Sequence, residues 1–219
     1  IKALTEAAHS VGAYAGFDCA HAAGNINMEL HDWNVDFAAW CTYKYMNSSP
    51  GGVSGIFVHN KHGENPETPR LAGWWGHKES ERFQMKKGFI PEPGAAGWQL
   101  SNAPVLAMAA HKASLDMFDE VGMDALVAKG KKLNAFLEQV VMDAQASNDK
   151  LEFTIITPEE RGCQLSMLAN ENGKALFDYL TEHDVIADWR EPNVIRLAPV
   201  PLYNSFMDVW EFGELLKDF

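Results

Sequence analysis

The sequence contains a lysine whose surroundings could make it a nucleophile. Lys44 follows an apolar segment and stands between two aromatic residues, Tyr43 and Tyr45. Partial removal from water would lower the pKa of its ammonium group and favour attack on an aldehyde. The alternative interpretation is a lysine at a strand end that extends its charged group into solvent.

A carboxylate stands upstream of this lysine. Asp18 also ends a short apolar segment, and a βαβ unit of about 30 residues would bring both side chains to one edge of a sheet. This pair suits pyridoxal phosphate, because a lysine forms a Schiff base with the cofactor and an acidic residue keeps its pyridine nitrogen protonated. Asp18 could instead be a helix N-cap or a turn residue.

Three further polar residues could serve such a site. His21 could stack on a cofactor ring or orient Asp18, although a histidine satisfied by a backbone group fits as well. Tyr43 could donate its hydroxyl to a phosphate oxygen or relay a proton, or be a buried tyrosine with a tethered hydroxyl. Arg196 is flanked by apolar residues and needs a partner, either a substrate carboxylate or an internal salt bridge.

An aromatic loop and an asparagine complete the candidates. Trp74 and Trp75 lie between glycines and precede His77, which predicts either an aromatic wall for a ring-bearing ligand or a contact between subunits. Asn102 precedes an expected helix and could cap it. Metal ligation is not indicated, because Cys19, His21 and Cys41 do not have the spacing of zinc ligands.

The composition bounds the class of protein. The 219 residues are 47% hydrophobic and 22% charged, enough to bury a core in one or two domains. The net charge of -12 disfavours nucleic acid as a partner. The three cysteines are widely spaced and fit a reducing cytoplasm better than a disulfide framework.

The ends and the hydropathy of the chain add two expectations. No apolar run approaches the roughly 18 to 20 residues that span a bilayer, so no membrane partner is expected. The first residues lack both a signal-peptide pattern and an initiator Met, and they resemble the middle of a helix. We therefore expect the chain to be a fragment.

The candidates in the first half belong to an α/β pattern. Residues 2–11 have helical periodicity, and residues 60–103 form a long irregular region of the kind that is usually functional. Short apolar runs typical of buried parallel strands cover residues 13–17, 37–42 and 54–59. The first two of these strands place polar residues at the edge where open α/β sheets bind ligands.

The second half mixes helices and strands in an α+β order. Helical patterns cover residues 104–119, 123–146, 173–183 and 205–217. Strand patterns cover residues 151–156, 163–168, 185–189 and 194–197.

Taken together, the motifs resemble the kynureninase family, from about residue 12 to the end. The blocks that carry the resemblance are Asp18 to His21, Tyr43 to Tyr45 with Asn47 and Gly51-Gly52, Gly73 to His77, Leu100 to Asn102, and Arg196 to Ser205. The last block is quite specific to the family, whereas the Asp18 and Lys44 pair alone would indicate only the broader aspartate-aminotransferase-like fold. Trp75 is a departure, because members of the family often carry Phe there.

The resemblance implies the fold of the aspartate-aminotransferase-like pyridoxal-phosphate enzymes. Residues 1–105 would form the second half of a large cofactor-binding domain with a mostly parallel sheet. Residues 106–219 would form a connecting helix and a small α+β domain. A homodimer with an active site shared across its interface is also implied.

The resemblance also assigns roles to residues. Lys44 would bind the cofactor covalently and act as the base at the substrate Cα, and Asp18 would pair with the pyridine nitrogen. His21 would lie beside the cofactor ring, while Tyr43 would bind the phosphate and take part in proton transfer. The expected substrate-binding residues are Arg196 for the α-carboxylate, with Trp74, Trp75, His77 and Asn102; Trp74 and Asn102 would also lie near the cofactor phosphate.

The implied reaction is hydrolysis of L-kynurenine or 3-hydroxykynurenine to anthranilate or 3-hydroxyanthranilate and L-alanine, a step of tryptophan catabolism that leads to NAD biosynthesis. Asn102 could hydrogen-bond a 3-hydroxyl group, which favours the hydroxylated substrate. Two alternatives stay open. One is another enzyme of the same fold, such as a cysteine desulfurase or an aminotransferase, and the other is a non-catalytic fragment.

Overall fold

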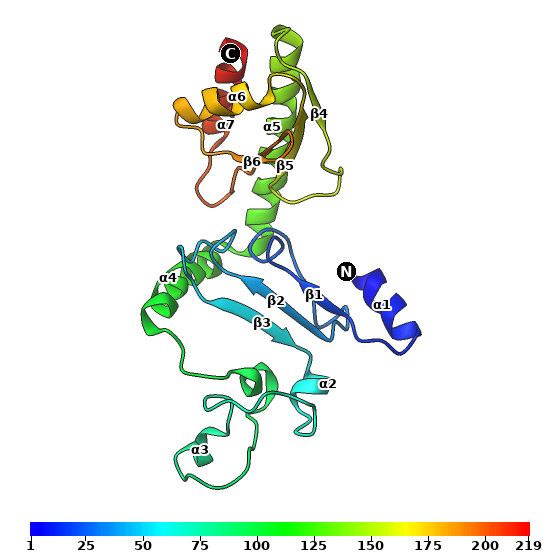
Figure 1. Cartoon of the computed structure of the whole chain (residues 1–219), viewed down its shortest axis with the longest axis vertical. Helices are drawn as coiled ribbons and strands as arrows, with labels where there is room; N and C mark the ends of the chain where they lie inside the picture. Colours follow the sequence, from blue (N-terminus) through cyan, green and yellow to red (C-terminus); the bar gives the residue numbers. More distant parts are fainter. The chain divides into compact units, whose positions relative to one another are not determined.

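The computed structural model describes residues 1–219, which fall into two compact units, Ile1–Glu120 and Val121–Phe219 (Figure 1). The two units are groups of residues in mutual contact and do not test the expected domains. The division into domains of 1–105 and 106–219 therefore stays a prediction. No helix in either unit is both long enough and apolar enough to cross a membrane.

The first unit is built on a three-stranded sheet in the order β1-β2-β3. It begins with helix α1 (Lys2–Ser10), and its strands are β1 (Gly16–Asp18), β2 (Phe37–Cys41) and β3 (Ser54–Val58). Strands β1 and β2 are parallel, with Gly16 opposite Phe37 and Asp18 opposite Ala39. The expected helix and all three expected strands are therefore present.

Strand β3 corrects one expectation, because it runs antiparallel to β2 rather than parallel to it. A parallel neighbour needs a crossover of a dozen or more residues, usually a helix. Here the connection folds into turns, and Ser49 and Gly51 take positive φ values of 78° and 72°. The chain therefore reverses direction and pairs Cys41 with Ser54 at the base of the turn.

The connection from β1 to β2 corrects a second expectation, since it contains turns and no helix. It supplies apolar residues to a small core that includes buried Cys19, Leu30 and Val35 together with Ala38 of β2. These residues cover one face of the sheet. On the opposite face, Phe37 and Ile56 remain about half exposed, at 53% and 47%.

Residues 60–103 form the irregular region that the sequence predicts, interrupted by short helices α2 (Asn60–Gly63), α3 (Glu79–Arg82) and η1 (Gly94–Trp98). Helix α4 (Val105–Val121) follows. It begins one residue after Pro104, which agrees with the preference of proline for a helix start.

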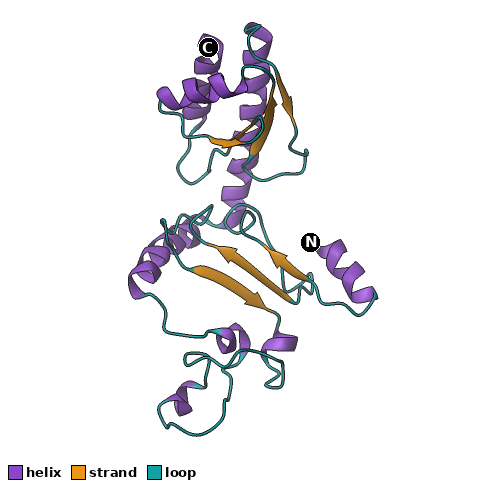
Figure 2. Ribbon diagram, in the orientation of Figure 1, coloured by secondary structure: helices purple, strands orange, loops and turns teal.

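The second unit is an α+β fold with an antiparallel sheet in the order β4-β5-β7-β6 (Figure 2). Its strands are β4 (Phe153–Ile155), β5 (Leu165–Ala169), β6 (Asp188–Arg190) and β7 (Val194–Leu197). Its helices are α5 (Met123–Ser147), α6 (Gly173–Glu182) and α7 (Phe206–Asp218). The α+β order predicted for this half is confirmed.

The core of the second unit follows from strand periodicity. Alternate residues of β5 and β7, such as Met167 and Ile195, are fully buried in one cluster with Leu133, Leu176 and Leu216 of the three helices. The intervening residues, among them Arg196, therefore lie on the other face of the sheet. This alternation makes a charged residue possible between two buried ones.

Candidate active site

The carboxyl ends of β1 and β2 bring the two central candidates to one edge of the sheet. Asp18 is the last residue of β1 and is exposed, and Lys44 lies three residues beyond the end of β2 and is half-buried. The parallel pairing of the two strands makes these ends neighbours. The sequence prediction that both side chains lie at the same edge is confirmed, although their connection contains no helix.

Lys44 sits on a turn that is tied at its base. Ser48 donates its backbone N–H to the Thr42 carbonyl at 3.1 Å, and the hydroxyls of the same two residues are 2.6 Å apart. Both residues are buried, and Thr42 also donates to the Val53 carbonyl. Inside the turn, the Asn47 N–H donates to the Lys44 carbonyl at 3.0 Å. These bonds fix the backbone from which the lysine side chain extends.

The segment after Asp18 packs against this turn. The His21 ring meets the Tyr45 ring edge-on, with 6.0 Å between their centroids. Gly24 has a φ of +77°, and a Cβ there would lie 2.9 Å from the Tyr45 backbone, so only glycine permits this approach. The position of His21 is therefore fixed relative to the lysine turn, beside Asp18.

Asp18 and Cys41 share one face of the sheet, because Asp18 is paired with Ala39 and Cys41 follows Ala39 by two residues. A hydrogen bond between the Tyr43 hydroxyl and Cys41 raises the pKa of the Tyr43 phenol, and nearby Asp18 raises it further. Tyr43 is 52% exposed, which contradicts the alternative of a buried tyrosine. It therefore presents a protonated hydroxyl next to Asp18.

Asp18 itself forms a local turn, since its Oδ1 accepts the backbone N–H of Ala20 at 2.8 Å. This bond occupies one oxygen and agrees with the turn interpretation. The carboxylate is nevertheless exposed at the sheet edge. It also raises the pKa of the Cys19 thiol, as does the burial of that thiol, which is the larger effect.

The tryptophan loop is held by a buried arginine. Arg82 is 7% exposed, donates to the carbonyls of Trp75 and His77 at 2.8 and 2.9 Å, and lies over the Trp75 ring at 4.3 Å. Trp74 points outward, with 42% of its surface exposed. Figure 1 shows the segment around α3 extending away from the carboxyl ends of β1 and β2. The loop thus does not join the Lys44 edge within this chain.

Asn102 is exposed and lies three residues before the first residue of α4, so it is not the N-cap of that helix. The capping interpretation from the sequence is wrong, because Pro104 occupies that position. The side chain of Asn102 is open to solvent and available for contact with another molecule.

Arg196 lies on β7 of the second unit and has an internal partner. Its Nε and Nη2 both contact Oδ2 of Asp188, which is its direct cross-strand neighbour on β6. Of the two interpretations left open by the sequence, the salt bridge is therefore formed. The side chain keeps 24% of its surface exposed, so it can also reach a ligand.

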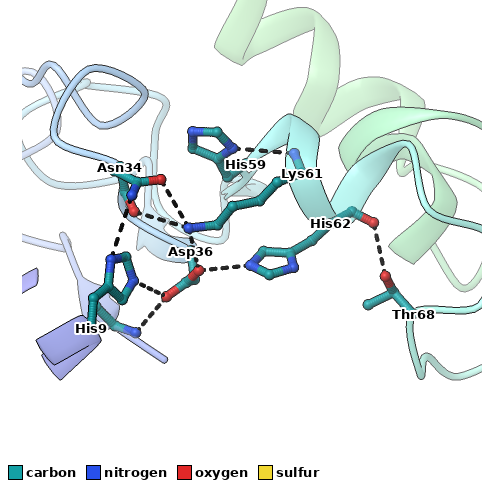
Figure 3. A network of polar contacts seen from close by, with 8 residues as sticks. His9, Asn34, Asp36, His59, Lys61, His62 and Thr68 are labelled. Carbon is teal, nitrogen blue, oxygen red and sulfur yellow. Dashed lines mark hydrogen bonds and ion pairs between the residues drawn. The ribbon is translucent and has the colours of Figure 1, made fainter. Parts of the chain in front are cut away.

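The sequence reasoning missed a second polar cluster, at the opposite end of β2 (Figure 3). Asp36 is 2% exposed and precedes the first residue of that strand. It accepts hydrogen bonds from His9 at 2.8 Å, from the Ala15 N–H at 2.7 Å and from His62 at 2.7 Å. The Lys61 ammonium lies 2.7 Å from the same carboxylate. The available signal in the sequence was a single charged residue, Asp36, between Val35 and the apolar residues of β2.

Burial alone would raise the pKa of Asp36. The hydrogen bonds from His62, Lys61, the Ala15 amide and His9 outweigh burial and hold that pKa well below its usual range. Asp36 is therefore ionised and fully paired, which is typical of a structural carboxylate rather than a catalytic one.

An apolar groove of about 500 Å³ crosses the exposed face of the first sheet. Its lining includes Tyr14, Phe37, Ile56 and Trp98, together with the paired Asp36 and His62. It lacks Lys44, Asp18 and Tyr43, and the carboxylate of Asp36 in its lining is already paired, so we assign the reactive site to the edge that bears those three residues.

Comparison with known proteins gives a consistent family. Residues 126–216 match the model of the kynureninase C-terminal domain. The chain is 56% identical to a kynureninase of Flavobacterium johnsoniae over 99% of the chain and 52% of that protein. It is 51% identical to a kynureninase of Coccidioides immitis over all of the chain and 48% of that protein. The chain thus spans about half the length of these curated relatives.

Solved structures show the fold. A cysteine desulfurase from Thermococcus onnurineus superposes with a TM-score of 0.76 at 14% identity, over 100% of this chain and 55% of that one. An alanine–glyoxylate aminotransferase from Nostoc superposes with a TM-score of 0.69 at 15% identity, over 98% and 56%. The predicted α/β fold class of pyridoxal-phosphate-dependent transferases is therefore confirmed.

Proposed function

Because the chain belongs with the kynureninases, whose C-terminal half it matches, we propose that it carries part of the active site of a pyridoxal-phosphate-dependent kynureninase. The reaction is the hydrolytic cleavage of the Cβ–Cγ bond of L-kynurenine or 3-hydroxykynurenine. The products are anthranilate or 3-hydroxyanthranilate and L-alanine, within tryptophan catabolism and NAD biosynthesis. The observation that carries the proposal is the shared sheet edge of Asp18 and Lys44.

The residues at this edge fit the cofactor. An exposed carboxylate, a half-buried lysine and a protonated phenol suit a pyridine nitrogen, an aldehyde and a phosphate, respectively. Lys44 would hold the cofactor covalently, Asp18 would bind its ring nitrogen and Tyr43 would donate to its phosphate. His21 would lie beside the ring.

When bound, pyridoxal phosphate supplies an electron-accepting ring that stabilises negative charge on the substrate carbon next to the amino group. The carboxylate of Asp18 would keep the ring nitrogen protonated. Lys44 would act as the base that takes the proton from the substrate Cα, and the turn that positions it is tied in place by Thr42 and Ser48. Tyr43 holds its proton at neutral pH and can relay one at the phenolic oxygen.

The substrate is recognised by groups outside this edge. Arg196 holds the α-carboxylate, because a guanidinium can donate two parallel hydrogen bonds to it. Trp74, Trp75 and His77 form an aromatic wall for the substrate ring, with Trp74 also near the cofactor phosphate. Asn102 lies near that phosphate as well and hydrogen-bonds the 3-hydroxyl, which favours 3-hydroxykynurenine.

The molecular setting follows from the same proposal. Trp74 and Asn102 are exposed here, which supports a homodimer in which one subunit completes the site of the other. Three free cysteines support a reducing compartment, and we place the enzyme in the cytoplasm.

Two alternatives compete with this proposal. Solved structures that resemble this chain include a cysteine desulfurase and an aminotransferase, but their identity is only 14% and 15%. Identity of 56% to a kynureninase therefore favours cleavage of kynurenine. A non-catalytic fragment is the second alternative for the 219 residues alone.

Turnover tests the proposal. The whole protein, supplied with pyridoxal phosphate, should release an anthranilate from kynurenine or 3-hydroxykynurenine, and Lys44→Ala should abolish this release. Lys112→Ala is the matched control, because Lys112 pairs with Asp116 on the exposed face of α4. Release of sulfur from cysteine or transfer of an amino group, without kynurenine cleavage, would contradict it.

The Asn102 assignment is tested in the same assay. Asn102→Ala should reduce kcat/KM for 3-hydroxykynurenine by about tenfold relative to kynurenine, since the hydroxyl loses its hydrogen-bond partner. An unchanged preference between the two substrates would contradict the role given to Asn102.

A further inference from the structure

A shared carboxylate lies beside the expected substrate-binding arginine. Oδ2 of Asp188 contacts Nε and Nη2 of Arg196, and it also lies 3.0 Å from Nε of Arg190 as an ion pair. Asp188 and Arg196 are direct cross-strand partners on β6 and β7, so their side chains extend from the same face of the sheet. This arrangement is part of the strand pairing and does not depend on a flexible loop.

The contacts leave a defined part of the guanidinium free. An arginine has five N–H donors, and Asp188 takes the one on Nε and one on Nη2. The remaining N–H groups, on Nη1 and on the outer side of Nη2, form the edge that binds a carboxylate bidentately. Arg196 has 24% of its surface exposed, so this edge is accessible to a ligand.

Charge favours the same conclusion. One carboxylate that is shared by two guanidinium groups leaves the cluster with one net positive charge. Arg190, which is 61% exposed, offsets the negative charge of Asp188, so the positive charge of Arg196 is not cancelled. A ligand carboxylate is therefore still attracted, even though Arg196 is already paired.

We propose that Asp188 is a positioning residue for substrate recognition: it holds Arg196 by its Nε side and presents the two terminal nitrogens to the α-carboxylate of an amino-acid substrate. The inference rests on the proposed function, because that function makes an amino-acid carboxylate the ligand of Arg196. An arginine without this restraint would lose side-chain entropy on binding.

The test measures binding without turnover. The ligand is 4-(2-aminophenyl)-4-oxobutanoate, which keeps the aromatic ketone and the carboxylate of kynurenine but lacks the α-amino group that reacts with the cofactor. Calorimetry on the whole protein should give a dissociation constant about tenfold higher for Asp188→Asn than for wild type, since Arg196 loses the ionic contact that holds it in position and must be ordered on binding. Asp188→Glu should recover part of the loss.

Asp178→Asn is the matched control, because Asp178 forms an exposed ion pair with Lys174 on α6 and changes the charge of the same unit equally. It should leave the dissociation constant unchanged. Asp188→Asn should also raise KM for L-kynurenine with little change in kcat. A kynurenine analogue that keeps the α-amino group but lacks the carboxylate should bind Asp188→Asn as well as wild type. A general loss of structure would weaken its binding too.

Unchanged affinity in Asp188→Asn, together with lost affinity in Arg196→Lys, would overturn the inference. Equal loss for ligands with and without a carboxylate would overturn it as well. Turnover by the wild-type protein decides the proposed function separately. A protein that leaves kynurenine intact, yet binds L-alanine in a manner that depends on Asp188, would contradict that function and retain the positioning role.

Discussion

Tyr43 illustrates how one side chain can hold a proton at an exposed position. The hydrogen bond with Cys41 is the main cause of its raised pKa, followed by the charge of Cys41, by burial and by Asp18. The phenol therefore keeps its proton at neutral pH. A phenol that ionised more readily would repel a phosphate and accept the proton that the proposed function requires it to donate.

The Tyr43 environment gives a spectroscopic prediction. The absorbance of ionised tyrosine is followed during an alkaline titration of the wild-type chain and of Tyr43→Phe, and the difference reports the Tyr43 phenol. Its pKa should lie above the ordinary tyrosine value of about 10. Cys41→Ala should return the pKa toward that value, because it removes the largest cause. A titration that is the same with and without Cys41 would contradict this account.

Single residues differ in how far the sequence could place them. The shared edge of Asp18 and Lys44 was predictable, because it follows from the ends of neighbouring parallel strands. The partner of Arg196 was not, because the choice of Asp188 depends on the register between β6 and β7. Register is set by tertiary packing, which a single sequence does not reveal.

At the scale of elements, Asp36 joins three parts of the first unit. Its hydrogen bonds connect α1 through His9 and α2 through His62 to the start of β2. The Lys61 ammonium adds a further bond from α2 to Asn34 at 2.9 Å. The network fixes the end of β2 opposite Lys44 and thereby stabilises the strand that carries the reactive turn.

Removal of the Asp36 charge should destabilise the chain. Asp36→Asn is expected to lower the free energy of unfolding by about 3 kcal/mol at pH 7, because the Lys61 ammonium loses its anion and the hydrogen bonds to a buried charged carboxylate are weakened. The pKa of Asp36 is lower in the folded chain than the value of about 3.9 in an unfolded one, so this contribution is present above that value and is lost as the pH falls below it.

Urea titrations at pH 7 and pH 3 check this prediction. The difference between wild type and Asp36→Asn should be large at pH 7 and smaller at pH 3. Asp32→Asn is the control, since Asp32 is 80% exposed and pairs with His31 at the surface. A difference for Asp36→Asn that does not depend on pH would show that the ionised carboxylate is not the source of the stability.

Elements with strong local patterns were predictable, and connections were not. The predicted helix over residues 123–146 agrees with α5 (Met123–Ser147), because its apolar positions repeat over many turns. The predicted direction of β3 was wrong, because an apolar run of this kind fits a parallel strand and an antiparallel strand equally. The Asp36 network was missed because its members are far apart in the sequence.

At the scale of the whole molecule, the chain combines a global net charge of -12 with local cationic groups at the sites expected to bind anions. Lys44 lies in the first unit, and Arg190 and Arg196 lie in the second. Local charge can therefore oppose the overall field where a phosphate or a carboxylate is bound. The chain spans about half the length of its curated relatives, so the complete reaction belongs to the whole protein.

The central claim is that Lys44 is the residue that binds pyridoxal phosphate. Borohydride reduction of the protein with its cofactor, followed by peptide mapping by mass spectrometry, tests it most directly. We predict a reduced cofactor on the peptide that contains Lys44, no label in Lys44→Ala and full label in Lys112→Ala. A label on another lysine, or no label on a protein that cleaves kynurenine, would contradict the account.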